Sequence, residues 1–251
     1  MKHLPVLAHG ELSEVLENIW FVQGAVKMPM LVPMKASRSM TVLRNPGNRE
    51  LTIVNSMRLD ERGLARLEKL GKVAHVLRIA GFHGRDDGFY RDRYGARVHA
   101  IRGQIYTRKL GKPNPEDAYM EPDIWLDETS SLPVPNARLK LLKTANPVEG
   151  LLLLDRDGGV LITGDSLQNT PQPDEYVNLP ARFMMKKMGF FKPCNVGPGW
   201  LQFAKPQASE VRSILNLNFA HVLPGHGEAV IGGAKEKFRP ALEGELKGCH
   251  E

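Results

Sequence analysis

Two short stretches in the second half of the chain decide its fold, VLITGDS at Val160–Ser166 and FAHVLPGHGE at Phe219–Glu228. In each stretch an apolar strand is broken by glycine or proline, and a residue that can bind a metal follows at once. That residue is Asp165 in the first stretch and His226 in the second. Because α/β sheets place ligands at the carboxyl ends of their strands, these loops predict a shared site.

An earlier stretch, KVAHVLRIAGFHGRDD at Lys72–Asp87, repeats this arrangement and places His83 and Asp87 behind its strand. Glycines near His83 and on both sides of His226 allow close backbone approach and leave the imidazoles accessible. Imidazole nitrogen together with carboxylate oxygen suits zinc, iron or manganese. Each loop alone also fits an ordinary turn, so the prediction depends on the three occurring together.

Strands and helices alternate around these loops, which predicts one α/β domain over residues 1–251 with helices outside two sheets. Lys109–Asn136, rich in proline and acidic residues, is expected to be an irregular insertion. The strongest local predictions are a hairpin at Gly150–Thr163 around an Asp-Gly-Gly turn and a helix from Asp60 to Leu70. We also expect strands at Asn18–Gln23, Met40–Arg44, Glu50–Asn55, Lys72–Ile79, Arg97–Ile101 and Phe219–Leu223, and helices at Pro180–Met188, Gln207–Leu215 and Ala234–Leu246.

The composition excludes several classes of protein. With 251 residues, 42% hydrophobic and 25% charged, the chain is neither disordered nor a coiled coil. It lacks an uninterrupted apolar run long enough to span a membrane. The net charge of +6 comes from basic residues spread along the chain, which argues against nucleic acid and favours a small, anionic substrate as the partner.

The chain has only two cysteines, Cys194 and Cys249, too few for a disulfide framework. This predicts a reducing compartment, the cytoplasm. Any metal site must therefore use histidine and carboxylate ligands, and the chain has 8 histidines to supply them.

The order and the sequences of the three loops resemble those of the metallo-β-lactamase superfamily, and the resemblance covers nearly the whole chain. Gly164–Ser166 corresponds to that family's Gly-Asp, which bridges two metals, and Leu223–Gly227 corresponds to the loop of its final histidine. The resemblance implies a four-layer αββα sandwich with the active site along one edge of the two sheets.

The first loop departs from the family's H-x-H-x-D-H pattern. His83 and Asp87 match the first histidine and the aspartate, whereas Arg85 and Gly88 stand where two further histidines are expected. The family's middle histidine is also missing, since no histidine lies between positions 99 and 221.

Four of the family's seven ligand positions are thus kept, namely His83, Asp87, Asp165 and His226. Arg85 puts a permanent cation where a first-site ligand would be, which is costly beside a divalent ion. The resemblance therefore implies a depleted site that holds one metal ion at most.

Two hypotheses follow. In the first, one zinc, iron or manganese ion on Asp87, Asp165 and His226, with or without His83, activates a water that attacks an ester, lactone, thioester or phosphodiester. Asp87 is a ligand or the general base, and Arg85 or Lys143 holds an anionic part of the substrate or stabilises the oxyanion. In the second, the protein is a metal-free and inactive binding protein, in which Arg85 pairs with Asp87 or Asp165 and replaces the metal's charge.

The segment Phe183–Trp200 gathers Met, Phe and Lys residues. Its default interpretation is core packing. If it is exposed, we expect a substrate lid or the contact surface of a homodimer there.

Overall fold

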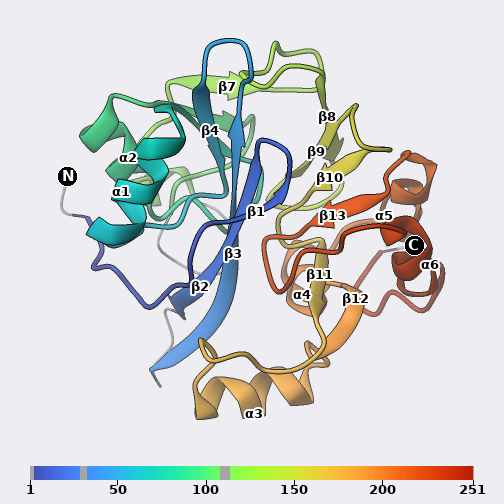
Figure 1. The fold of residues 1–251 in the computed structure, drawn as a ribbon. Helices are drawn as coiled ribbons and strands as arrows, with labels where there is room; N and C mark the ends of the chain where they lie inside the picture. Colours follow the sequence, from blue (N-terminus) through green and yellow to red (C-terminus); the bar gives the residue numbers. More distant parts are fainter. Residues whose placement is uncertain (1–2, 29–32, 108–113, 251) are drawn as a thin grey trace.

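The computed structural model describes residues 3–28, 33–107 and 114–250, and Figure 1 shows how they are arranged. Two β-sheets lie side by side at the centre, and helices cover the outer face of each. Separate clusters of buried apolar side chains lie under the helices on either side and between the two sheets. This is the four-layer αββα sandwich that the sequence predicts.

The first sheet has seven strands that follow one another in sequence order. They are β1 (Ser13–Leu16), β2 (Ile19–Met28), β3 (Met34–Arg44), β4 (Glu50–Val54), β5 (Lys72–Arg78), β6 (Arg97–Ile101) and β7 (Ile124–Leu126). The pairs from β1 to β4 are antiparallel and those from β4 to β7 are parallel. Parallel neighbours need a crossover, and helices α1 (Glu61–Leu70) and α2 (Asp87–Tyr94) supply two of them.

Helix α1 begins where the sequence predicts it. The Asp60 side chain accepts a hydrogen bond from the backbone N–H of Gly63 at 2.7 Å, which satisfies one of the donors left free at a helix start. Leu64 and Leu67 then point into the buried cluster beneath the first sheet. Their burial fixes which face of the helix meets the sheet.

The second sheet has the order β13 (His221–Leu223), β10 (Val160–Ile162), β9 (Glu149–Leu154) and β8 (Ala137–Leu142). Strands β9 and β10 form the predicted antiparallel hairpin, and all their residues are buried. Strand β10 pairs with β13 in parallel, so the two loops that follow these strands leave the sheet at the same edge.

The remaining elements cover the second sheet and one end of the sandwich. Helices α4 (Pro198–Ala204), α5 (Ala208–Arg212) and α6 (Ala234–Glu243) and the 3-10 turn η2 (Ser213–Asn216) lie on the second sheet. The small sheet of β11 (Leu167–Thr170) and β12 (Lys192–Val196) leads to helix α3 (Leu179–Lys187), at the lower end of the molecule in Figure 1.

Several details differ from the sequence prediction. The helix expected at Gln207–Leu215 is divided into α5 and η2. The stretch expected to be an irregular insertion contains a 3-10 turn, η1 (Pro115–Asp117), and strand β7, while residues 109–113 lie outside the described part of the chain. Strand β7 forms because it completes the sheet beside β6, a partner that local sequence does not reveal.

Among the described residues, no helix is both long and apolar enough to cross a membrane.

Candidate metal centre

Close backbone contact brings the three ligand-bearing loops together. A Cβ atom on Gly164 would lie 2.3 Å from the Cβ of Ala80, and one on Gly225 would lie 2.6 Å from the carbonyl oxygen of Gly164. The N–H of Gly225 also donates to that carbonyl at 3.0 Å. Only glycine allows this approach, so the glycines next to the ligands assemble the site.

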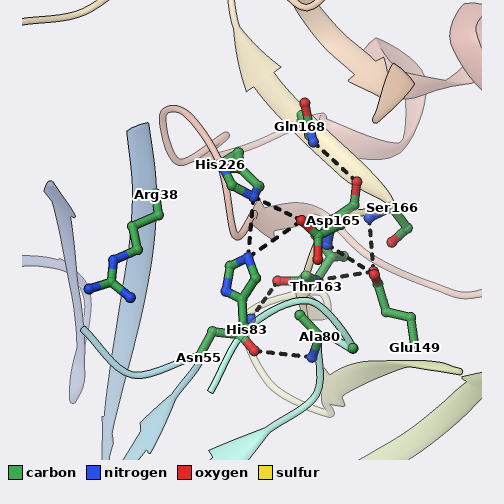
Figure 2. Close-up of polar contacts among 12 residues, drawn as sticks. Arg38, Asn55, Ala80, His83, Glu149, Thr163, Asp165, Ser166, Gln168 and His226 are labelled. Atoms are coloured by element: carbon green, nitrogen blue, oxygen red, sulfur yellow. Dashed lines mark hydrogen bonds and ion pairs between the residues drawn. The ribbon is translucent and has the colours of Figure 1, made fainter. Parts of the chain in front are cut away.

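His83, Asp165 and His226 meet where these loops converge (Figure 2). The Asp165 Oδ1 atom lies 2.9 Å from His226 Nε2 and 3.4 Å from His83 Nε2, and the two Nε2 atoms are 3.2 Å apart. All three side chains are largely buried, with His226 the most exposed at 22%. The structure thus brings together three of the four predicted ligands.

The orientation of His226 is fixed from the first sheet. Its Nδ1 atom lies 2.7 Å from the carbonyl oxygen of Ser37, which can only accept, so Nδ1 carries a proton. Nε2 then faces Asp165 and His83 with its lone pair, unless the ring is protonated. A backbone carbonyl on the second ring nitrogen is the usual support of a metal-ligating histidine.

The spacing of these atoms fits one small divalent ion. A tetrahedral ion with bonds of about 2.0–2.1 Å sets its ligand atoms roughly 3.3 Å apart. The three measured separations, 2.9, 3.2 and 3.4 Å, lie close to that value. Asp165 Oδ2, which is buried, has no hydrogen-bond partner among the described residues. The donor set is thus suited to zinc, with a position left for water or substrate.

Charge balance in the group is set by burial and by the shared carboxylate. Burial lowers the pKa of His83, although Asp165 opposes this effect. Burial alone would also lower the pKa of His226. The hydrogen bond to Asp165 and the negative charge of that carboxylate outweigh burial, so the pKa of His226 is raised. For Asp165, burial is outweighed by the two histidines, which hold its pKa well below the usual range. This arrangement therefore stabilises a cation between the three groups, either a proton or a metal ion.

Glu149, at the start of β9, holds the Gly-Asp-Ser loop from below (Figure 2). Its carboxylate is fully buried and accepts the backbone N–H groups of Gly164, Asp165 and Ser166 at 3.3, 3.0 and 2.9 Å. Burial and the nearby charge of Asp165 raise the pKa of Glu149. Glu149 therefore fixes the backbone that presents Asp165.

Asn55, directly after β4, links the His83 loop to the Gly-Asp-Ser loop. Its side-chain oxygen accepts the N–H groups of Ile79 and Ala80 at 3.3 and 3.2 Å, and its side-chain nitrogen donates to the carbonyl of Thr163 at 3.1 Å. The residue is buried and has a positive φ of 53°, a conformation that asparagine tolerates better than most residues. One amide thus ties the ends of β5 and β10 together.

The structure does not place Asp87 with the other predicted ligands. Asp87 opens helix α2 and is fully buried, and its two carboxylate oxygens accept hydrogen bonds from Ser56 at 2.5 Å and Tyr106 at 2.6 Å. Burial raises the pKa of Asp87. Among the described residues the group that could hold a metal is His83, Asp165 and His226 alone. Asp87 instead anchors the His83 loop to the core.

Arg85 and Lys143 have different surroundings. Arg85 lines the cavity above the three ligands and donates to the carbonyl of Lys27 at 2.5 Å. Lys143 is exposed, forms an ion pair with Glu128 and does not line that cavity. The arginine whose charge acts on His83 is Arg38, a buried residue of β3 that pairs with Asp86.

A cavity of about 220 Å³ opens onto the three ligands. One wall comes from β2 and β3, through Val26, Met28 and Ala36. The other wall comes from the segment around α3 and α4, through Met184, Met185, Met188, Phe190, Trp200 and Phe203. In the stretch Phe183–Trp200, Met185 and Trp200 are buried, as core packing predicts, and both line the cavity together with Met184, Met188 and Phe190. A substrate lid or a homodimer contact in this stretch stays a prediction.

Sequence reasoning missed Glu149, Asn55 and Arg38 as parts of the site. Glu149 carried a usable signal, because a single carboxylate at the head of the apolar run EGLLLL is costly to bury without partners. Asn55 and Arg38 carried none, because their roles depend on loops that are distant in sequence.

Comparison with solved structures identifies the fold. The DIM-1 metallo-β-lactamase exposed to ceftazidime superposes with a TM-score of 0.59 at 16% identity, over 96% of this chain and 99% of that one. The metallo-β-lactamase FIM-1 from Pseudomonas aeruginosa, in its mono-zinc form, gives 0.60 at 10% identity over 97% of both chains. A metallo-β-lactamase from Hirschia baltica gives 0.57 at 11% identity, over 92% of this chain and 97% of that one.

The chain thus has the metallo-β-lactamase fold. At these identities the likeness concerns the fold alone, and function must be argued from the site. The sequence matches no protein-family model, and no curated protein is significantly similar to it.

Proposed function

We propose that this protein is a hydrolase of the metallo-β-lactamase fold with a single metal site made by His83, Asp165 and His226. The observation that carries the proposal is the set of three ligand atoms 2.9–3.4 Å apart at the floor of a cavity. The substrate is an ester, lactone, thioester or phosphodiester. A bound zinc, iron or manganese ion would lower the pKa of a coordinated water towards 7 and so supply the nucleophile.

The residues of the chain position this chemistry. Ser37 and Glu149 fix His226 and Asp165 before substrate arrives, so little reorganisation is needed during reaction. Asp165 Oδ2 is available among the described groups to accept a hydrogen bond from the attacking water and orient it. Arg85, which lines the cavity, brings positive charge to the oxygen of the substrate that becomes negative, whereas the Arg38 guanidinium is paired with Asp86.

A second function deserves comparison because one observation favours it. The three side chains already lie within or near hydrogen-bonding distance of each other, so a proton on His226 satisfies the group without a metal. The protein would then bind a ligand in the cavity without turnover. Arg85 is not required to replace the metal in this case, since His226 itself supplies the positive charge.

Hydrolysis of 4-nitrophenyl acetate and of bis(4-nitrophenyl) phosphate by protein loaded with zinc, iron or manganese tests the proposal. We expect a metal-dependent rate on one of them that falls at least a hundredfold in His226→Ala. His250→Ala is the matched control, since its side chain lies near the end of the chain, away from the cavity lining. A rate that is equal in His226→Ala and His250→Ala contradicts the assignment.

A further inference from the structure

The cavity above the three ligands differs sharply in character between its floor and its walls. At the floor are His83, Asp165 and His226, with Arg38 beside them, whereas most of the remaining lining is hydrocarbon, sulfur or aromatic ring. A charged or strongly polar group in the walled part would lose its hydration without gaining hydrogen bonds. The cavity therefore selects ligands that are polar at one end and apolar at the other.

The walls are suited to a flexible chain. Among the described residues, four methionines line the cavity, Met28 from β2 and Met184, Met185 and Met188 from α3 or next to it. Methionine has an unbranched, polarizable side chain that adapts to the shape of what it contacts. Such a wall can adapt to a flexible hydrocarbon chain and does not require a ligand of one rigid shape.

The mouth of the cavity also has an apolar surface to cover. Phe203 lines the cavity yet is 57% exposed. A ligand that continues from the floor along α3 and α4 would remove part of this ring from water, which is favourable in proportion to the area covered. Lys27, Arg38 and Arg85 line the same cavity, with Arg38 paired to Asp86, and Asp165 is the one acidic residue among the described lining residues. The charge there complements a carboxylate or a polarised carbonyl.

We propose that the site takes acyl compounds with an unbranched hydrocarbon chain, the carbonyl or carboxylate lying at the three ligands and the chain between β2 and α3. The reaction on these compounds, a hydrolysis that releases the fatty acid, rests on the proposed function. Their binding to the cavity does not depend on it. Among the substrates considered above, it selects acyl esters and thioesters over phosphodiesters.

Binding is tested with saturated carboxylates from butanoate to dodecanoate, which cannot be hydrolysed, by titration calorimetry below their micelle concentrations. Each added methylene that is fully buried should raise the affinity roughly fourfold, until the cavity is full. An affinity that does not change with chain length overturns the proposal.

Variants on one helix locate the chain. Met184→Trp fills the cavity and should lower the affinity for decanoate at least tenfold while leaving butanoate unchanged. Phe183→Trp is the matched control, because Phe183 is on the same helix but 78% exposed and does not line the cavity. Equal decanoate affinity in the two variants, both folded by circular dichroism, also overturns the proposal.

Hydrolysis of 4-nitrophenyl esters with acyl chains of two to twelve carbons separates this inference from the proposed function. Chain-dependent binding of carboxylates with no hydrolysis keeps the inference and rejects the hydrolase. Metal-dependent hydrolysis whose kcat/KM is the same for acetate and decanoate esters keeps the hydrolase and rejects the inference.

Discussion

The support that Glu149 gives to the Gly-Asp-Ser loop leads to a quantitative prediction. Glu149→Ala leaves three buried backbone N–H groups, those of Gly164, Asp165 and Ser166, without their acceptor. Each such loss costs about 1–3 kcal/mol, so the variant should lose roughly 3–9 kcal/mol of unfolding free energy. Glu149→Gln keeps one side-chain oxygen to accept hydrogen bonds from the N–H groups of Gly164 and Ser166, but its NH2 group then faces the N–H of Asp165. This variant should lose about 1–3 kcal/mol of unfolding free energy.

Urea unfolding followed by tryptophan fluorescence at pH 7 measures both losses. Glu17→Ala serves as control, since the Glu17 side chain is 83% exposed and its loss should change the free energy by less than about 0.5 kcal/mol. Since an ordinary domain is stable by only about 5–15 kcal/mol, Glu149→Gln is the variant of choice if Glu149→Ala does not fold. A Glu149→Gln protein as stable as wild type would refute the reasoning.

Three further predictions concern other parts of the molecule. Asn55→Ala removes three buried hydrogen bonds and should cost about 2–4 kcal/mol in urea unfolding; a loss below about 0.5 kcal/mol would contradict this role. Burial lowers the pKa of His99 to about 4, so His99 takes up a proton at a higher pH in the unfolded chain than in the folded one. The unfolding free energy should therefore fall by up to about 3 kcal/mol as the pH drops from about 6.5 towards 4. His99→Gln should flatten that dependence in unfolding curves taken between pH 4 and 7, and an unchanged slope would exclude His99 as its source. Lys143→Ala should leave decanoate affinity in calorimetry within twofold of wild type, because Lys143 pairs with Glu128 outside the cavity; a tenfold loss would place it in the site after all.

Much of the fold can be predicted from local pattern alone. The hairpin of β9 and β10 and the helix after Asp60 are confirmed, because runs of leucine, a turn and a cap are properties of neighbouring residues. Strand β12 was missed, because KPCNV contains proline and its Cys194 has a positive φ. Such a strand exists only because β11 is there to pair with it.

The candidate site shows the same limit. His83, Asp165 and His226 could be found because each follows a strand at a glycine, and glycine is what the packed loops require. The spacing in the first loop also suggests Asp87, but whether a side chain faces the site depends on how α2 begins, and this one faces Ser56 and Tyr106. The apolar run around Glu149 indicates a buried carboxylate that needs partners, but the partners cannot be read from it, because the three N–H groups that donate to Glu149 come from a loop across the hairpin turn.

The central claim is that His83, Asp165 and His226 hold one metal ion, and the metal content of the purified protein tests it most directly. After supplementation with zinc, iron or manganese and gel filtration, elemental analysis should find about one ion per chain in wild type. Asp165→Ala and His226→Ala, each shown to be folded, should lose that ion, and His250→Ala should keep it. Wild-type protein that retains well under one ion per chain under all three supplements, or a full ion in Asp165→Ala, would contradict the claim.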